Sequence, residues 1–287
     1  MQKWLILLYL TATLFCTVCV ADISTDKETS FALSSAYLTQ QMVQQKTMVE
    51  PQVRPFITDD SRVVGNKLTQ LESWTRFDKH AAEHWILGAY GPTNWLELTV
   101  GGVWGSEFDS EGNTLSYGLP LLQAKFLLRP YESGSWPGLG AVVGTFLPYG
   151  KGGLRADGYG TFGFLTVSQC FGPQEDVLIH ANVGANYLRV NGENELLNTW
   201  GLGSQIRTLK GFHLVGEVFS GDPYIPGSGI SWQAGFRHFF SDELQIDGTV
   251  GKGISGEVTL PLWVSVGIRL VFNHFRDKKL AKDSTSR

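Results

Sequence analysis

The chain has 287 residues, a formal net charge of −4, and a composition that is 43% hydrophobic and 12% aromatic, with 34 glycines. The excess of acidic over basic residues gives no support for nucleic-acid binding. The length of the chain fits one large β domain. After residue 21 no stretch is apolar enough for a membrane helix, which needs about 20 apolar residues. The composition is typical of a soluble β protein or of a membrane barrel, whose strands alternate apolar and polar residues.

The first 21 residues have the pattern of a secretory signal peptide. Lys3 precedes an apolar run over residues 5–20, and the small residue Ala21 ends that run. We expect cleavage near Ala21 and export to the outer membrane of a Gram-negative bacterium. An uncleaved anchor helix is the alternative, which the shortness of the run disfavours. Two of the three cysteines leave with the signal, so we expect no internal disulfide.

The remaining chain divides into an arm, a barrel and a tail. Residues 22–53 are polar and rich in Gln, Thr and Ser, and we expect a flexible periplasmic arm there. The barrel is expected over residues 54–272, and residues 273–287 form a charged tail. Closing strands of such barrels commonly end the chain on an aromatic residue, so a tail after Phe272 departs from the usual pattern.

From residue 67 onward the hydrophobic period is two, which indicates half-buried strands. In the segment from Trp263 to Phe272, large apolar residues alternate with Ser265, Gly267 and Arg269. The expected strands cover residues 67–77, 82–90, 95–104, 115–128, 139–147, 159–170, 176–189, 196–208, 212–220, 230–240, 243–252 and 261–272. The sequence therefore predicts an all-β, transmembrane antiparallel β-barrel of about twelve strands, of the outer-membrane type.

The connections between these segments fall into two alternating classes. Compact connections are expected at residues 91–94, 131–138, 172–176, 209–211 and 241–242, and loops rich in Gly, Pro and charge at 105–114, 148–158, 190–195, 221–229 and 252–260. Outer-membrane barrels pair short periplasmic turns with longer outer loops, so we place the compact set in the periplasm. Both termini then lie on the periplasmic side.

The polar face of the expected strands carries nine ionisable side chains of both signs. They are Glu72, Glu97, Lys125, His180, Arg207, Glu217, Arg237, Asp247 and Arg269. A dry sandwich core excludes charges whereas a wet lumen does not, so we expect these residues to line the lumen. For any one of them, the solvated face of a soluble β-sheet is the alternative. Five tryptophans at or within strands are expected in an aromatic girdle, namely Trp74, Trp85, Trp104, Trp200 and Trp232.

Three segments resemble a known family of outer-membrane proteins. They are Arg54, Pro55, Phe56, Ile57, Thr58, Asp59 and Asp60, followed by Gln70-Leu71-Glu72 in the first strand, and residues 88–98 with Leu96-Glu97-Leu98. This pattern is similar to that of the phenol-degradation meta-pathway type of outer-membrane protein, over roughly residues 54–272. The resemblance implies a barrel linked to uptake of aromatic or other hydrophobic compounds, with no catalytic residues.

The motif and the histidines also admit other interpretations. Arg54, Asp59 and Asp60 are compatible with a ligand site, but Pro55 and the turn-forming acids favour a short plug or an entry to the barrel wall. The six histidines show no metal-binding spacing, and His180 beside a serine of a neighbouring strand is the one arrangement that could support catalysis. We expect a polar lumen lining there, and no catalytic site, metal or cofactor.

These observations predict a monomeric barrel in outer-membrane lipid that lets small solutes pass down their gradient. About twelve strands leave a narrow lumen, so a small solute or a partly plugged pore is expected. The alternatives are a non-conducting structural or surface-binding barrel and, with less support, an outer-membrane enzyme. The sequence does not identify the solute.

Overall fold

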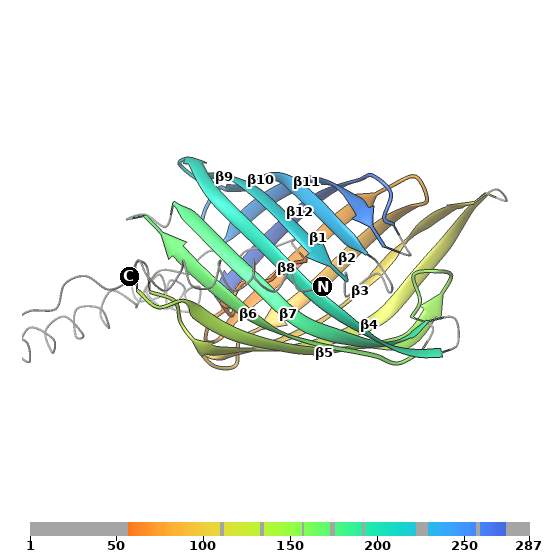
Figure 1. Ribbon diagram of the computed structural model, residues 1–287, viewed down its shortest axis with the longest axis horizontal. Helices are drawn as coiled ribbons and strands as arrows, with labels where there is room; N and C mark the ends of the chain where they lie inside the picture. The colour runs from red at the N-terminus through yellow and green to blue at the C-terminus, as the bar shows by residue number, and fades with distance from the viewer. Residues whose placement is uncertain are drawn as a thin grey trace, which may run out of the picture. The chain divides into compact units, whose positions relative to one another are not determined.

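Twelve antiparallel strands close into a barrel in the computed structural model of the protein (Figure 1), which confirms the expected fold class. The structure describes residues 57–109, 112–132, 135–156, 158–172, 176–190, 193–221, 229–256 and 259–273. The strands are Leu68–Phe77 (β1), Ala81–Tyr90 (β2), Leu96–Asp109 (β3), Gly112–Arg129 (β4), Gly138–Lys151 (β5), Gly160–Phe171 (β6), Val177–Val190 (β7), Glu193–Leu209 (β8), Phe212–Ser220 (β9), Ile230–Phe239 (β10), Leu244–Ser255 (β11) and Trp263–Asn273 (β12). Each strand pairs with its neighbours in the chain, and β1 pairs with β12 to close the ring.

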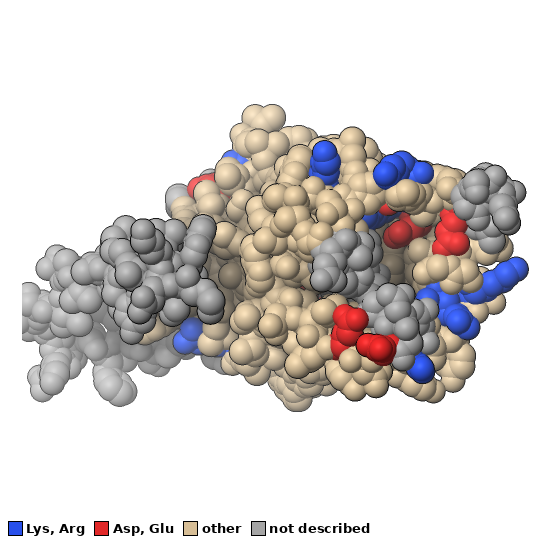
Figure 2. Space-filling view, turned by 45° about the vertical axis from the view of Figure 1, so that its right-hand side comes forward, with Lys and Arg blue, Asp and Glu red and all other residues tan. Residues whose placement is uncertain are grey.

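The alternation of side chains along β12 is the one expected from the sequence. Val266 and Ile268 are exposed on the outer wall, whereas Ser265 and Arg269 are buried inside. Figure 2 shows a broad stretch of the surface with few charged residues, while most of the visible Lys, Arg, Asp and Glu lie toward the right-hand end. An apolar band of this kind suits contact with lipid. The described residues include no helix with the length and apolarity needed to cross a membrane.

The strands extend further into the expected long loops than the sequence indicated. The predicted loop at residues 105–114 is largely strand, because β3 runs to Asp109 and β4 begins at Gly112. Likewise, β7 continues to Val190 and β8 already begins at Glu193. Period-two hydrophobicity reports contact with an apolar surface, so it fades where a hairpin extends beyond that surface while backbone pairing continues.

Two of the five tryptophans assigned to an aromatic girdle lie inside the barrel, so that prediction was wrong for them. Trp74 of β1 and Trp85 of β2 are cross-strand partners whose rings stack with centroids 5.7 Å apart and an interplanar angle of 7°. Each shares strand parity with buried charged residues, Arg76 in β1 and Glu83 in β2. Trp104 and Trp200 are exposed on the outer wall.

An apolar cluster occupies part of the barrel interior. Leu87 of β2, Leu121 of β4, Val142 of β5 and Phe162 of β6 are buried against one another, with Phe146 packed at the edge. The barrel interior therefore contains an apolar patch formed by these strands, next to buried polar residues of the same strands such as Lys125 and Ser168.

Replacing Val142 with alanine is expected to lower the free energy of unfolding by about 2 kcal/mol, because two buried methyl groups are lost and a small cavity remains. Urea titration in detergent micelles, followed by tryptophan fluorescence, measures the change. Val143→Ala on the same strand is the matched control, since Val143 faces outward and is half exposed. Equal losses in the two variants would contradict a tightly packed interior cluster.

Candidate functional site

The nine ionisable residues singled out from the sequence all lie on strands. Eight of them are at most 4% exposed, and Arg207 is half-buried. These eight side chains point into the barrel from eight different strands. The interior therefore holds several charges of each sign, and their partners decide what the lumen can do.

The inner wall over β10 to β12 and β1 contains pairs of oppositely charged residues on neighbouring strands. Arg237 of β10 lies opposite Asp247 of β11 in the strand register, and it donates a hydrogen bond to Gln205 of β8 at 2.7 Å. Arg269 of β12 lies opposite Glu72 of β1. Opposite charges in direct register stabilise a particular pairing of strands.

A short segment before the first strand lies inside the barrel. We call residues 57–65 the lumen segment. Thr58, Asp59, Asp60, Ser61 and Arg62 are all at least 93% buried. Asp59 and Asp60 belong to the motif for which the sequence favoured a short plug or an entry to the wall over a ligand site, and both side chains lie in the barrel interior.

The backbone amides of the lumen segment donate to side chains of the wall. Both oxygens of the Glu217 carboxylate accept, one from the Ile57 amide at 2.9 Å and the other from the Thr58 amide at 2.8 Å. The Ser61 amide donates to the Ser168 hydroxyl at 2.8 Å. At the other end, the Val64 amide donates to Glu97 at 2.8 Å. Buried amides need such acceptors, and here the lumen-facing residues provide them.

Asp59 is held through both its backbone and its side chain. Its carbonyl oxygen accepts from the Thr166 hydroxyl at 2.7 Å. When the side-chain amide of Asn182 is oriented with its nitrogen toward that same carbonyl oxygen, the nitrogen donates to it at 2.8 Å. The side-chain oxygen of Asn182 then accepts from the Asp59 backbone amide at 2.9 Å. The Asp59 carboxylate accepts from the Lys125 ammonium at 2.9 Å. Contacts from β4, β6 and β7 thus converge on one residue.

Asp60 forms the second ion pair of the lumen segment. Its carboxylate lies 2.7 Å from the Arg62 guanidinium and 3.6 Å from the Lys125 ammonium. Burial raises the pKa of Asp60, but the charges of Arg62 and Lys125 together lower it by more than burial raises it. The pKa of Asp60 therefore lies below the usual range for an aspartate. The carboxylate therefore stays charged and paired at neutral pH.

Replacing Lys125 with methionine is expected to loosen the lumen segment by about 1–3 kcal/mol, since the Asp59 carboxylate loses a charged donor in a buried site. Hydrogen–deuterium exchange of the Ser61 amide measures the effect, which should be about a tenfold loss of protection or more. Lys151→Met removes an exposed lysine of β5 and serves as the control. Unchanged protection in Lys125→Met would show that the ion pair does not hold the segment.

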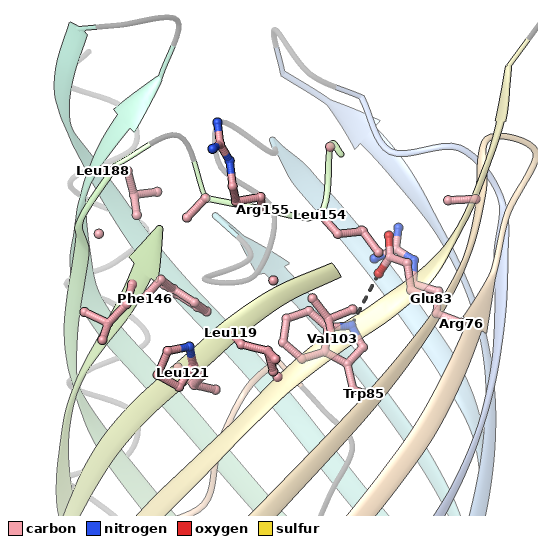
Figure 3. Close-up of a pocket in the computed structure, with 18 of the residues that line it drawn as sticks. Arg76, Glu83, Trp85, Val103, Leu119, Leu121, Phe146, Leu154, Arg155 and Leu188 are labelled. Carbon is pink, nitrogen blue, oxygen red and sulfur yellow. Dashed lines mark hydrogen bonds between the residues drawn. The ribbon is translucent and has the colours of Figure 1, made fainter. Parts of the chain in front are cut away.

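A cavity of about 390 Å³ lies above the apolar cluster, and we call it the vestibule. Its lining includes Trp85, Val103, Leu121, Phe146 and Leu188 from five strands, drawn in Figure 3. Residues of the loops after β5 and β11 also line it, so it lies at the barrel end opposite the start of β1. This volume falls within the range of small-molecule sites.

The charged residues of the vestibule lining are Arg76, Asp78, Glu83, Arg155 and Arg189. Arg76 and Glu83 lie side by side in Figure 3, and the Trp85 indole donates to Glu83 at 3.4 Å. The Arg76 guanidinium also stacks over the Trp263 ring, 4.5 Å from its centroid. Leu154 lies above the cavity in the same view. The vestibule therefore combines an apolar interior with a rim that carries charges of both signs.

The loop after β5 folds over the vestibule and is fixed there by hydrogen bonds. The Gly153 amide donates to Glu107 of β3 at 2.6 Å, and the Leu154 amide donates to the Ser116 hydroxyl of β4 at 2.9 Å. The Ser116 hydroxyl in turn donates to the Lys151 carbonyl at 2.9 Å. The roof of the vestibule is thus attached to the neighbouring strands β3 and β4.

Sequence reasoning did not find the vestibule. Its lining comes from strands that are distant in sequence, and its apolar inner positions resemble ordinary core. Strand parity was the available signal, because Trp85 shares a face with Glu83, and Leu188 shares one with His180. Large apolar residues on the polar face indicate that part of the lumen is apolar.

His180 gives no support to a catalytic interpretation. It lies opposite Ser168 in the strand register, but that hydroxyl accepts from the Ser61 amide. Neither ring nitrogen of His180 has a hydrogen-bond partner within the described part of the chain. In the same part, no group of three or more His, Cys, Asp or Glu side chains could hold a metal ion. The predicted signal peptide, the arm, Arg54, Pro55, Phe56 and the tail after Asn273 lie outside the described residues.

Comparison with known structures shows the same fold in outer-membrane channels. A COG4313 outer membrane channel from Pseudomonas putida F1 superposes with a TM-score of 0.58 and 12% identity, over 77% of this chain and 100% of that one. The KdgM porin in complex with disordered oligogalacturonate gives a TM-score of 0.51 and 11% identity, over 71% of this chain and 99% of that one. No curated protein matches the sequence. Residues 55–272 match the model of a protein family, and the chain belongs to that family, described as uncharacterised conserved protein UCP029691.

Proposed function

We propose that the protein resides in the outer membrane of a Gram-negative bacterium as a monomeric channel for passive entry of small molecules. The observation that carries this proposal is the vestibule, a cavity of about 390 Å³ inside a closed barrel with an apolar outer band. A route through a barrel lumen needs no cofactor, because solutes move down their own gradient. The fold that it shares with outer-membrane channels supports the proposal.

The vestibule favours small solutes with an aromatic or other apolar part. Trp85 and Phe146 offer ring faces, and Val103 and Leu121 offer apolar contact. Burial of apolar solute surface there is favourable by about 25 cal/mol per Å². Arg76 and Glu83, cross-strand neighbours in the lining, can bind one polar group of such a solute. This solute class also agrees with the likeness of the first strands to the phenol-degradation type.

A conductance and uptake experiment tests the proposal. The purified, folded protein is placed in planar bilayers and in liposomes loaded with small aromatic, aliphatic and sugar solutes. We expect discrete channel openings, and flux that favours the aromatic and aliphatic solutes over sugars of similar size. Absence of both current and flux, with the barrel shown to be folded by its resistance to unfolding in cold detergent, would rule out the channel.

A non-conducting barrel is the second candidate, and the lumen segment is the observation that favours it. Residues 58–62 occupy the interior between β4, β6 and β9, and the Thr58 amide, the Ser61 amide and the Asp59 carboxylate bond to the wall. In this case the loops around the vestibule would bind a partner at the cell surface. The same bilayer experiment separates the two candidates, because this one predicts no current under any condition.

A further inference from the structure

The lumen segment is bound to the wall in a different way from the strands. Its described amide donors at Ile57, Thr58, Ser61 and Val64 all bond to side chains, and none of these bonds belongs to the ladder of the barrel. Every backbone group of the barrel wall can therefore keep its cross-strand partner if the segment leaves. Water can replace the side-chain partners of a departing polar segment at little net cost.

One carboxylate holds the upper end of the lumen segment. Glu217 of β9 is 4% exposed, and it accepts from two successive amides while Gln233 of β10 donates to the same carboxylate at 2.6 Å. The Ile57 side chain packs on Phe219, Leu260 and Trp263. Release of this single carboxylate would free the first two amides together.

The same end of the segment lies against the lining of the vestibule. Leu260, which contacts Ile57, is also a lining residue of the cavity. Arg76, another lining residue, stacks over Trp263, which belongs to the same cluster as Ile57. A solute in the vestibule would therefore touch side chains that also position Ile57.

The lower end of the segment is its covalent junction with β1, and the backbone there is suited to a hinge. Gly65 has φ of +93° and Lys67 has φ of +61°, both in the left-handed region. The Lys67 amide donates to the Gly91 carbonyl at the turn after β2, at 2.6 Å. Closely spaced left-handed residues at an element boundary allow a change of chain direction over a short distance.

We propose that the lumen segment is a gate that swings out of the lumen about its junction with β1 when Glu217 releases the amides of Ile57 and Thr58. This inference rests on the proposed channel function. Solute in the vestibule favours release, through Leu260 and Trp263. The segment carries Asp59, Asp60 and Arg62 out with it, so the open lumen differs from the closed one in charge as well as in width.

A reversible cross-link tests the gate. A Cβ atom built at Gly201 of β8 would lie 3.2 Å from the Cβ atom of Thr58, close to the spacing of about 3.5–4.5 Å found in disulfides. The double variant Thr58→Cys with Gly201→Cys should therefore oxidise readily. We expect the oxidised protein to show at least about tenfold fewer openings than the reduced protein, because a covalent bond prevents release of the segment. The two single-cysteine variants are the controls.

A second variant keeps the proposal testable if the cross-link fails to form. Glu217→Gln preserves side-chain size but removes the charged acceptor, so openings should rise about tenfold or more. Glu193→Gln is the matched control, because Glu193 is an exposed acid at the start of β8. Its openings should stay at the level of the unaltered protein.

Thiol labelling gives a readout of movement that does not depend on current. Ser61 is fully buried, and Ser61→Cys should react with a membrane-impermeant maleimide only when the segment leaves. We expect faster labelling when Glu217→Gln is combined with it. If the double-cysteine variant carries equal currents when oxidised and when reduced, the gate is overturned while the channel stands. Faster labelling with no current from any variant would overturn the channel, and with it the gate as a control of flux.

Discussion

Replacing Arg237 with methionine is expected to lower the free energy of unfolding by about 3–5 kcal/mol, the typical loss when one partner of a buried charge pair is removed. Arg237 is fully buried on β10 and donates to Gln205 across the lumen wall. Its cross-strand neighbour Asp247 is 2% exposed and would lose the opposite charge in its register. Urea titration in detergent micelles, monitored by tryptophan fluorescence and by heat-modifiable gel mobility, measures the change.

Two further variants separate the lost charge from lost packing. Arg207→Met removes an arginine that is only half-buried, and it should cost less than about 1 kcal/mol. Adding Asp247→Leu to Arg237→Met removes the uncompensated acid, so part of the stability should return. If Arg237→Met were as stable as the unaltered protein, the charges of this wall would be solvated rather than buried.

Replacing Val103 with tryptophan is expected to reduce the flux of aromatic solutes on the order of tenfold, equivalent to about 1.4 kcal/mol. Val103 is 4% exposed on β3 and lines the vestibule, so a larger ring at this position occupies space that a solute would need. Liposome uptake of a small aromatic solute, compared with that of a simple salt, measures the effect. The salt flux should fall less, because hydrated ions gain nothing from an apolar surface.

Val100→Trp provides the matched control for this variant. Val100 lies on the same strand, faces outward and is 53% exposed, so its replacement leaves the vestibule unchanged. Its flux should equal that of the unaltered protein. Equal flux in Val103→Trp and Val100→Trp would place the solute route away from the vestibule.

The wall of the barrel could be predicted from the sequence because each strand carries its own signal. Alternation along a single strand reports which residues face an apolar surface, and it needs no knowledge of distant neighbours. Arg269, Asp247 and Glu217 were assigned to the inner face in this way, and all three are buried there. The tryptophans at 74 and 85 were misplaced because their type was given more weight than their parity.

The contents of the barrel could not be predicted in the same way. The lumen segment has no period, and its contacts come from residues such as Lys125, Ser168 and Glu217, which are brought together only by the closed ring. A motif such as Thr58-Asp59-Asp60 is equally compatible with a turn and with a ligand site until the acceptors around it are known. The vestibule likewise exists only between elements that are distant in sequence.

The pairing of β1 with β12 has a consequence for how the protein is assembled. This seam joins the two strands that are farthest apart along the chain, so closing it carries the largest loss of chain entropy, and we expect it to form last. Glu72 and Arg269 face each other there, and their opposite charges favour the correct partner. Because the lumen segment directly precedes β1, we expect the curling sheet to close around a segment that is already inside. An empty tube is therefore not a required intermediate in the biogenesis of this barrel.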